Sequence, residues 1–83
     1  MKKYLVFIER KETFTGNSIP EHRTFIQNLR ESEALISAGG FSDQSGGAYI
    51  VRADNLDQAL EMVQKDPMYQ EGACTYKVKE WLA

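Results

Sequence analysis

The chain has 83 residues, of which 42% are hydrophobic and 27% charged, and its formal net charge is −2. Its lysines and arginines are scattered among acidic residues and form no basic stripe, which argues against a nucleic-acid-binding surface. No stretch approaches the roughly 20 apolar residues of a membrane span. The apolar run over residues 4–8 is too short for a secretory signal. We therefore expect a cytoplasmic protein.

A chain of this length forms one domain, expected over residues 1–83, and such a small domain leaves roughly 40% of its unfolded surface exposed. Its core therefore gains from a partner chain. The single cysteine, Cys74, excludes an intrachain disulfide and a cysteine-based zinc site. We expect an inert core cysteine, with a reactive thiol as the alternative.

The first predicted element is a strand over residues 4–8, because this run is aromatic and β-branched and is followed by a polar loop over 10–17. Its apolar residues do not alternate. A strand that is apolar on both faces is expected to be covered on both faces.

A helix is predicted to start at Ser18 and to run to about Glu33. Ser18 is the expected cap, Pro20 suits the first turn, and Glu21 stands where a capping box requires an acidic residue. The stripe expected to face the core contains Ile19, His22, Ile26 and Leu29, with Phe25 beside it.

The second half of the chain is predicted to begin with a hairpin, formed by strands over 35–41 and 48–51 around a turn of Gly, Ser and Asp. A second helix, capped by Asp54 or Asn55, then ends at Asp66-Pro67, because proline cannot continue a helix. Residues 73–81 alternate between apolar and polar, which predicts a half-exposed final strand closing with Trp81, an expected core or interface aromatic.

This element order predicts an α+β fold of ferredoxin-like βαββαβ topology, with an antiparallel sheet of order 4-1-3-2 and both helices on one face. The continuous apolar runs of strands 1 and 3 suit central positions, and the alternation of strand 4 suits an edge. Two helices leave the second face of the sheet uncovered although its central strands are apolar there. We therefore expect a homodimer through the sheet face.

Connectivity places three polar side chains at one end of this fold: His22, Asp43 and Asp66. His22 is the only histidine, and a carboxylate such as Asp43 could hold its tautomer, which would make the two a general acid/base pair. The alternatives are a structural histidine at the helix start, a turn residue at Asp43 and a helix stop at Asp66. Phe14, in the loop over 10–17, could close the site.

Binding roles are assigned to Asp66, Phe14 and Ser18, although Ser18 also reads as a helix cap. One histidine with scattered aspartates is a weak metal pattern, so no metal is expected. No phosphate loop or dinucleotide glycine pattern occurs, so no cofactor is expected either.

Several segments together resemble the YciI-like (YCII-related) proteins. They are the helix containing His22, Phe25, Ile26 and Leu29, residues 36–43, residues 53–59, the pair Asp66-Pro67, and a closing strand with Trp81. The resemblance implies a dimeric α/β barrel and a His-Asp active site, which carries over onto His22 and Asp43 with Asp66 as a third member. It also implies kinship with a dehydrochlorinase of a chlorinated hydroxyhydroquinone. Gly40 stands where the family usually has proline, which loosens the backbone before Asp43.

The residues and the resemblance support two main functions. The first is a cofactor-independent acid/base enzyme of the lyase or isomerase type, acting on a small organic substrate through His22 and Asp43. The second is a non-catalytic dimeric module that binds a small molecule or serves as an accessory to another protein. A monooxygenase or haem-binding relative is supported by architectural analogy alone.

Overall fold

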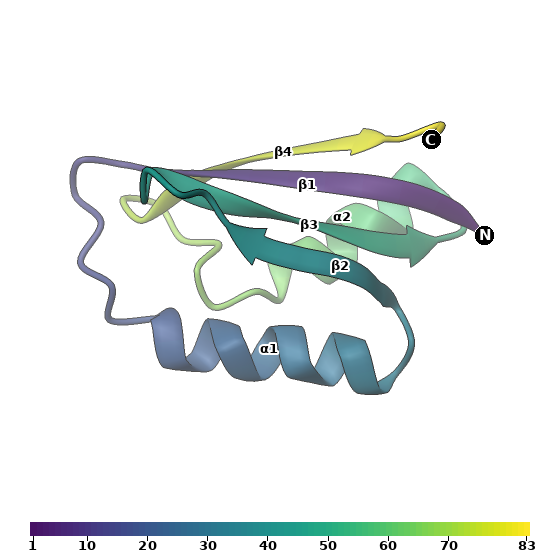
Figure 1. Ribbon diagram of the computed structural model, residues 1–83, viewed down its shortest axis with the longest axis horizontal. Helices are drawn as coiled ribbons and strands as arrows, with labels where there is room; N and C mark the ends of the chain where they lie inside the picture. Colours follow the sequence, from purple (N-terminus) through teal and green to yellow (C-terminus); the bar gives the residue numbers. More distant parts are fainter.

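The computed structural model describes all 83 residues and has the predicted βαββαβ order. Its elements are β1 (Lys2–Arg10), α1 (Ile19–Glu31), β2 (Leu35–Gly40), β3 (Gly46–Ala53), α2 (Leu56–Gln64) and β4 (Cys74–Glu80). The antiparallel sheet has the order β2-β3-β1-β4, which is the predicted order read from the opposite edge. Both helices lie on the same side of the sheet (Figure 1). The predicted α+β fold of ferredoxin-like topology is confirmed.

The core lies between the sheet and the two helices. Alternate residues of β1 point toward the helices, and Tyr4 and Val6 stand opposite Val51 and Tyr49 of β3. All of these side chains are buried, and α2 packs Ala59 and Val63 into the same cluster. The two central strands therefore owe their positions to the burial of apolar surface, the main favourable term in folding.

The opposite face of the sheet is also apolar on the central strands, as the continuous runs predicted. Leu5 stands opposite Ile50, and both are half-buried. The ring of Phe7 packs against Phe41, with 5.2 Å between the centroids. By contrast, β4 alternates and presents lysines on this face, Lys77 beside Phe7 among them.

The two helix starts differ in how they are capped. Asn55 caps α2, and its side chain accepts a 2.8 Å hydrogen bond from the backbone N–H of Gln58. The capping box predicted at α1 is wrong. Ser18 is the residue before the helix, but its backbone (φ −93°, ψ 2°) already lies within a turn and its side chain caps nothing. An effective cap needs extended backbone at this position, as Asn55 has.

Helix α1 packs less closely on the sheet than α2 does. None of its residues is fully buried, and its apolar stripe is only half-buried. Strand β2, which lies above it in Figure 1, buries only Leu35. The helix also ends at Glu31, before the predicted end, because Glu33 takes a left-handed conformation with φ 65°. Neither helix is long and apolar enough to cross a bilayer.

Candidate functional site

The site is organised around Asp66, which directly follows the end of α2. The backbone N–H of Asp66 donates to the carbonyl of Val63, and Pro67 then prevents another helical turn. The chain turns inward here, so Asp66 is only 2% exposed and is the single buried charged residue of the fold. The predicted helix stop is thus also a buried carboxylate, and such a group needs partners to be tolerated.

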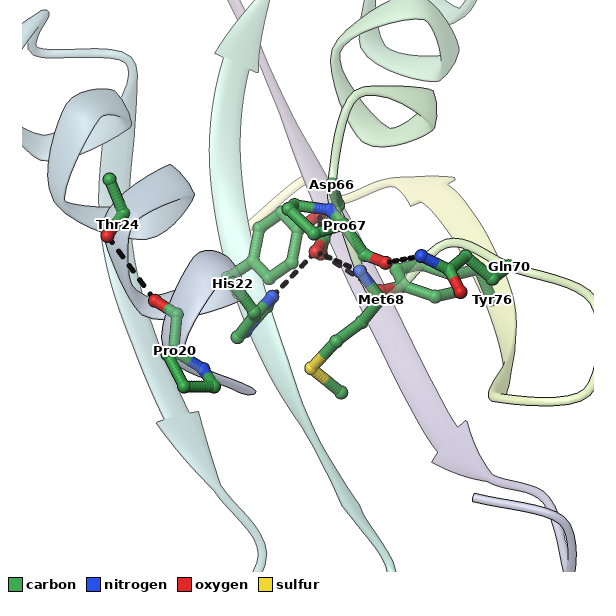
Figure 2. Close-up of polar contacts among 9 residues, drawn as sticks. Pro20, His22, Thr24, Asp66, Pro67, Met68, Gln70 and Tyr76 are labelled. Atoms are coloured by element: carbon green, nitrogen blue, oxygen red, sulfur yellow. Dashed lines mark hydrogen bonds and ion pairs between the residues drawn. The ribbon is translucent and has the colours of Figure 1, made fainter. Parts of the chain in front are cut away.

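Four donors satisfy the carboxylate of Asp66. Its Oδ1 lies 2.7 Å from Nδ1 of His22 and 2.9 Å from the backbone nitrogen of Met68. Its Oδ2 accepts hydrogen bonds from the hydroxyls of Tyr76 at 2.9 Å and Tyr49 at 3.3 Å. Figure 2 shows His22 of α1 and Tyr76 of β4 beside Asp66, with Met68 following in the same segment as Asp66. No buried side-chain nitrogen or oxygen is left without a partner.

The two tyrosines act as fixed donors in this network. Burial and the neighbouring Asp66 carboxylate raise the pKa of Tyr49 well above its ordinary value. The same two causes, in the same order, raise the pKa of Tyr76. Both hydroxyls therefore keep their protons at neutral pH and continue to donate to Asp66.

His22 stands between this network and a pocket. Its side chain is 19% exposed, whereas that of Asp66 is fully enclosed. Because Nδ1 is committed to Asp66, Nε2 is the ring nitrogen without a protein partner, and it is not sealed from solvent. Beside it lies a pocket of about 320 Å³ between α1 and the β2–β3 hairpin. Ile8, Ile26 and Met68 supply apolar walls to this pocket.

Glycines of the hairpin leave the room that this pocket occupies. Gly40 stands opposite Gly47, which stands opposite Ile8, so all three positions face the helices. A Cβ at Gly40 would meet nothing closer than the carbonyl oxygen of Gly46 at 3.8 Å. A Cβ at Gly47 would instead lie 2.6 Å from the carbonyl oxygen of Gly39. Gly47 is thus required by close strand approach, whereas Gly40 widens the pocket.

The predicted contact between His22 and Asp43 is absent. The carboxylate of Asp43 accepts a 2.9 Å hydrogen bond from the backbone N–H of Ser45. Hydrogen bonding by the side chain of Ser45, and then by its backbone, lowers the pKa of Asp43. Asp43 is exposed in the hairpin turn and does not line the pocket. Phe41, which leads into the turn, packs against Phe7 on the sheet face opposite to the helices.

The other two residues with predicted binding roles lie outside the pocket as well. Phe14 and Ser18 line a separate pocket between the loop that precedes α1 and residues 70–73. The ring of Phe14 lies under the guanidinium of Arg10, 4.5 Å from the ring centroid. Phe14 therefore touches the pocket only through Arg10, which does line it.

Several residues of the site were not anticipated from the sequence. Tyr49 and Tyr76 read as core residues, yet a buried tyrosine usually finds a partner for its hydroxyl, and that rule could have directed attention to Asp66. The arginines that line the pocket belong to β1 and α1, and no sequence motif around them indicates that they share a site. Arg10, Arg23 and Arg30 are brought together by the packing of these elements alone.

Metal-binding and thiol chemistry find little support in this arrangement. No three His, Cys, Asp or Glu side chains are grouped so as to hold a metal ion. Cys74 is buried, and burial raises the pKa of its thiol, which is the behaviour of a core cysteine.

Known structures share this fold. The 5-chloro-2-hydroxyhydroquinone dehydrochlorinase TftG from Burkholderia phenoliruptrix AC1100, solved in complex with 2,5-dihydroxybenzoquinone, superposes with a TM-score of 0.76. The match covers 95% of this chain and 92% of TftG at 17% sequence identity. The structure of MtbAldR matches with a TM-score of 0.62 and 11% identity over all of this chain and 55% of that one. At these identities the likeness concerns the fold.

Sequence comparison is more specific. The uncharacterized protein YjpA of Bacillus subtilis (strain 168) is 36% identical over 81 residues, which make up 98% of this chain and 95% of YjpA. Residues 3–82 match the YCII-related domain family. The resemblance found in the sequence is thus confirmed across nearly the whole chain, and the protein belongs to the YCII-related family.

Proposed function

We propose that this protein is a cofactor-independent acid/base enzyme of the lyase or isomerase type, in which His22 moves a proton on a small organic substrate. The observation that carries the proposal is the 2.7 Å contact between His22 Nδ1 and Asp66 Oδ1, which leaves Nε2 free beside a pocket. Asp66 replaces Asp43 as the proposed partner of His22.

In the proposed mechanism each group has a defined task. The Asp66 carboxylate holds the proton of neutral His22 on Nδ1, so the lone pair of Nε2 is available to accept a proton from the substrate. The imidazolium that forms is stabilised by the adjacent carboxylate. His22 then returns the proton to another atom of the substrate in an isomerisation, or to a leaving group in an elimination. Tyr49 and Tyr76 position Asp66 through its second oxygen.

The fold likeness to TftG supports this reaction class, because its name describes an elimination, the removal of hydrogen chloride from a hydroxylated ring. The specific substrate does not carry over at 17% identity. The pocket has a volume of about 320 Å³, which lies near the lower end of the range for small-molecule sites and suits a ligand about the size of a single substituted ring.

Chemical modification of the single histidine tests the proposal. Diethyl pyrocarbonate acylates an accessible, unprotonated imidazole nitrogen, and the presence of one histidine makes the absorbance change specific to His22. We expect the native protein to react at mildly alkaline pH and Asp66→Asn to react more slowly, because the amide no longer supports the charge that develops on the ring. Asp43→Asn is the matched control and should react as the wild type does.

Two outcomes would contradict the acid/base assignment. If His22 reacts only after unfolding, it is a structural histidine, and the non-catalytic binding module becomes the better description. If Asp43→Asn slows the reaction as much as Asp66→Asn does, the pairing with Asp66 does not govern the chemistry of the ring.

We also propose that two copies of the chain pack through the open sheet face. Leu5, Phe7 and Ile50 form an apolar strip there that is only half-buried in one chain. Light scattering should show a dimer for the wild type and for Gln27→Glu, an exposed position on α1. Phe7→Glu should shift the protein toward the monomer, because it would bury a charge in the interface. A folded wild-type monomer at micromolar concentration would refute the dimer.

A further inference from the structure

The pocket beside His22 is lined by positive charge only. Arg10 at the end of β1 and Arg23 and Arg30 on α1 all contribute to its lining, together with His22, and no aspartate or glutamate does. The chain as a whole carries 12 acidic and 10 basic residues. A pocket with three arginines and no acid therefore has a local charge opposite in sign to that of the whole chain.

These arginines retain donors that no protein group uses. Arg10 donates to the backbone carbonyl of Gln44 at 3.1 Å, and Arg30 donates to the side chain of Gln27 at 3.2 Å. Neither contact is with a carboxylate. The lysine or arginine ion pair of the structure joins Lys2 to Glu80, so no arginine pairs with a carboxylate within the chain. Each guanidinium carries five N–H donors, most of which remain free.

We propose that this arginine-lined pocket binds a small organic carboxylate, with the carboxylate on Arg23 and the apolar part of the ligand against Ile8 and Ile26. His22 and Arg23 both line this pocket, so a carboxylate held on Arg23 keeps the rest of the ligand in the cavity that His22 also borders. Arg30, two helical turns further along α1, and Arg10 contribute positive potential from the pocket rim.

The backbone near the pocket favours a carboxylate over a phosphate. Phosphate sites commonly use free backbone N–H groups at a helix start. At the start of α1, Ile19 and His22 already donate to the carbonyls of Gly16 and Ser18, and Pro20 has no N–H. Recognition therefore falls mainly to the guanidinium groups, whose planar fork matches a carboxylate or a phosphate in a bidentate geometry, so the preference for a carboxylate comes from the backbone. The apolar walls further favour an organic ligand over a bare ion.

This inference deepens the proposed function. The placement of the reacting atoms near His22 rests on the proposed acid/base function, whereas the binding of the carboxylate by the arginines does not. The test uses benzoate and its neutral isostere benzamide as probes, followed by amide chemical shifts of the hairpin residues that line the pocket. We expect benzoate to shift these amides in a saturable way and benzamide to leave them nearly unchanged. Arg23→Gln should weaken benzoate binding by about tenfold or more.

Matched variants separate bidentate recognition from general charge. Arg23→Lys keeps the charge and loses the planar fork, so it should also weaken binding. Arg52→Gln makes the same change outside the pocket and should bind benzoate as the wild type does. Equal shifts from both probes, no response to benzoate at millimolar concentration, or an equal loss in Arg52→Gln would overturn the proposal. Inorganic phosphate binding as tightly as benzoate would overturn the carboxylate assignment.

The same experiment distinguishes the two proposals. Benzoate should still bind to His22→Gln, because the carboxylate is held by arginine. Selective benzoate binding combined with an unreactive His22 would preserve the carboxylate site and remove the acid/base function. A reactive His22 without benzoate selectivity would do the reverse.

Discussion

Replacement of Asp66 should cost this small domain a large share of its stability. The Asp66→Ala variant removes the acceptor of four hydrogen bonds, from His22, Met68, Tyr49 and Tyr76, and leaves a cavity in their place. Each buried donor that loses its acceptor costs about 1–3 kcal/mol, and up to four donors lose theirs here. Native domains have unfolding free energies of only about 5–15 kcal/mol, so this loss is expected to be near the limit that the fold tolerates.

The isosteric change Asp66→Asn should be milder. One amide oxygen can still accept from His22 and Met68, while the amide nitrogen can donate to the tyrosine hydroxyls once these rotate. Only the charge on the acceptor is lost, so we expect the unfolding free energy to fall by about 1–2 kcal/mol. The Asp43→Ala variant should have a much smaller effect than either, because Asp43 is exposed and its side chain bonds only within its own turn.

Urea unfolding followed by circular dichroism measures these differences. All variants need the same protomer concentration, because the stability of a dimer depends on it. The expected order of midpoints is wild type, Asp43→Ala, Asp66→Asn and Asp66→Ala, from highest to lowest. If Asp66→Ala unfolds at the same urea concentration as Asp43→Ala, the buried network around Asp66 does not exist and the reasoning is refuted.

Further predictions concern the same region. Because the pKa values of Tyr49 and Tyr76 are raised in the folded state, the unfolded chain loses these protons first, and the unfolding free energy should fall as pH rises above about 10. Tyr49 alone contributes up to about 1.4 kcal/mol per pH unit, and the more exposed Tyr76 adds a smaller, solvent-screened amount. Urea titrations at increasing pH should show a shallower fall in the double variant Tyr49→Phe/Tyr76→Phe, and an equal fall would count against the buried tyrosine pair. Gly47→Ala should lower the unfolding free energy by about 1–3 kcal/mol, because its Cβ would meet backbone at 2.6 Å. Gly40→Ala should leave the unfolding free energy nearly unchanged. Gly40→Leu should fill the pocket and abolish the benzoate-induced shifts. If Gly40→Leu binds benzoate as the wild type does, the ligand does not occupy this pocket.

The sequence by itself determined the fold. Whether apolar and polar residues alternate along a strand is a local property of the sequence, and it indicates directly which faces of the strand are buried. Continuous apolar runs in β1 and β3 therefore identified the centre of the sheet, and alternation in β4 identified an edge. The end of α2 at Asp66-Pro67 was equally local, because proline excludes a further helical turn whatever surrounds it. The capping box at Ser18 failed for the complementary reason, since capping depends on the backbone conformation as well as on residue type.

Only the tertiary structure decided which carboxylate serves His22. Connectivity brought Asp43 and Asp66 to the same end of the fold, but a hydrogen bond requires atoms within about 3 Å in a suitable direction. Asp43 accepts a hydrogen bond within its own turn. Asp66 instead points inward at the end of α2, and because it is buried its carboxylate must be hydrogen-bonded by protein donors. Arg10 of β1 likewise lies far in sequence from Arg23 and Arg30 of α1, and only the packing of these elements gives the three a common pocket.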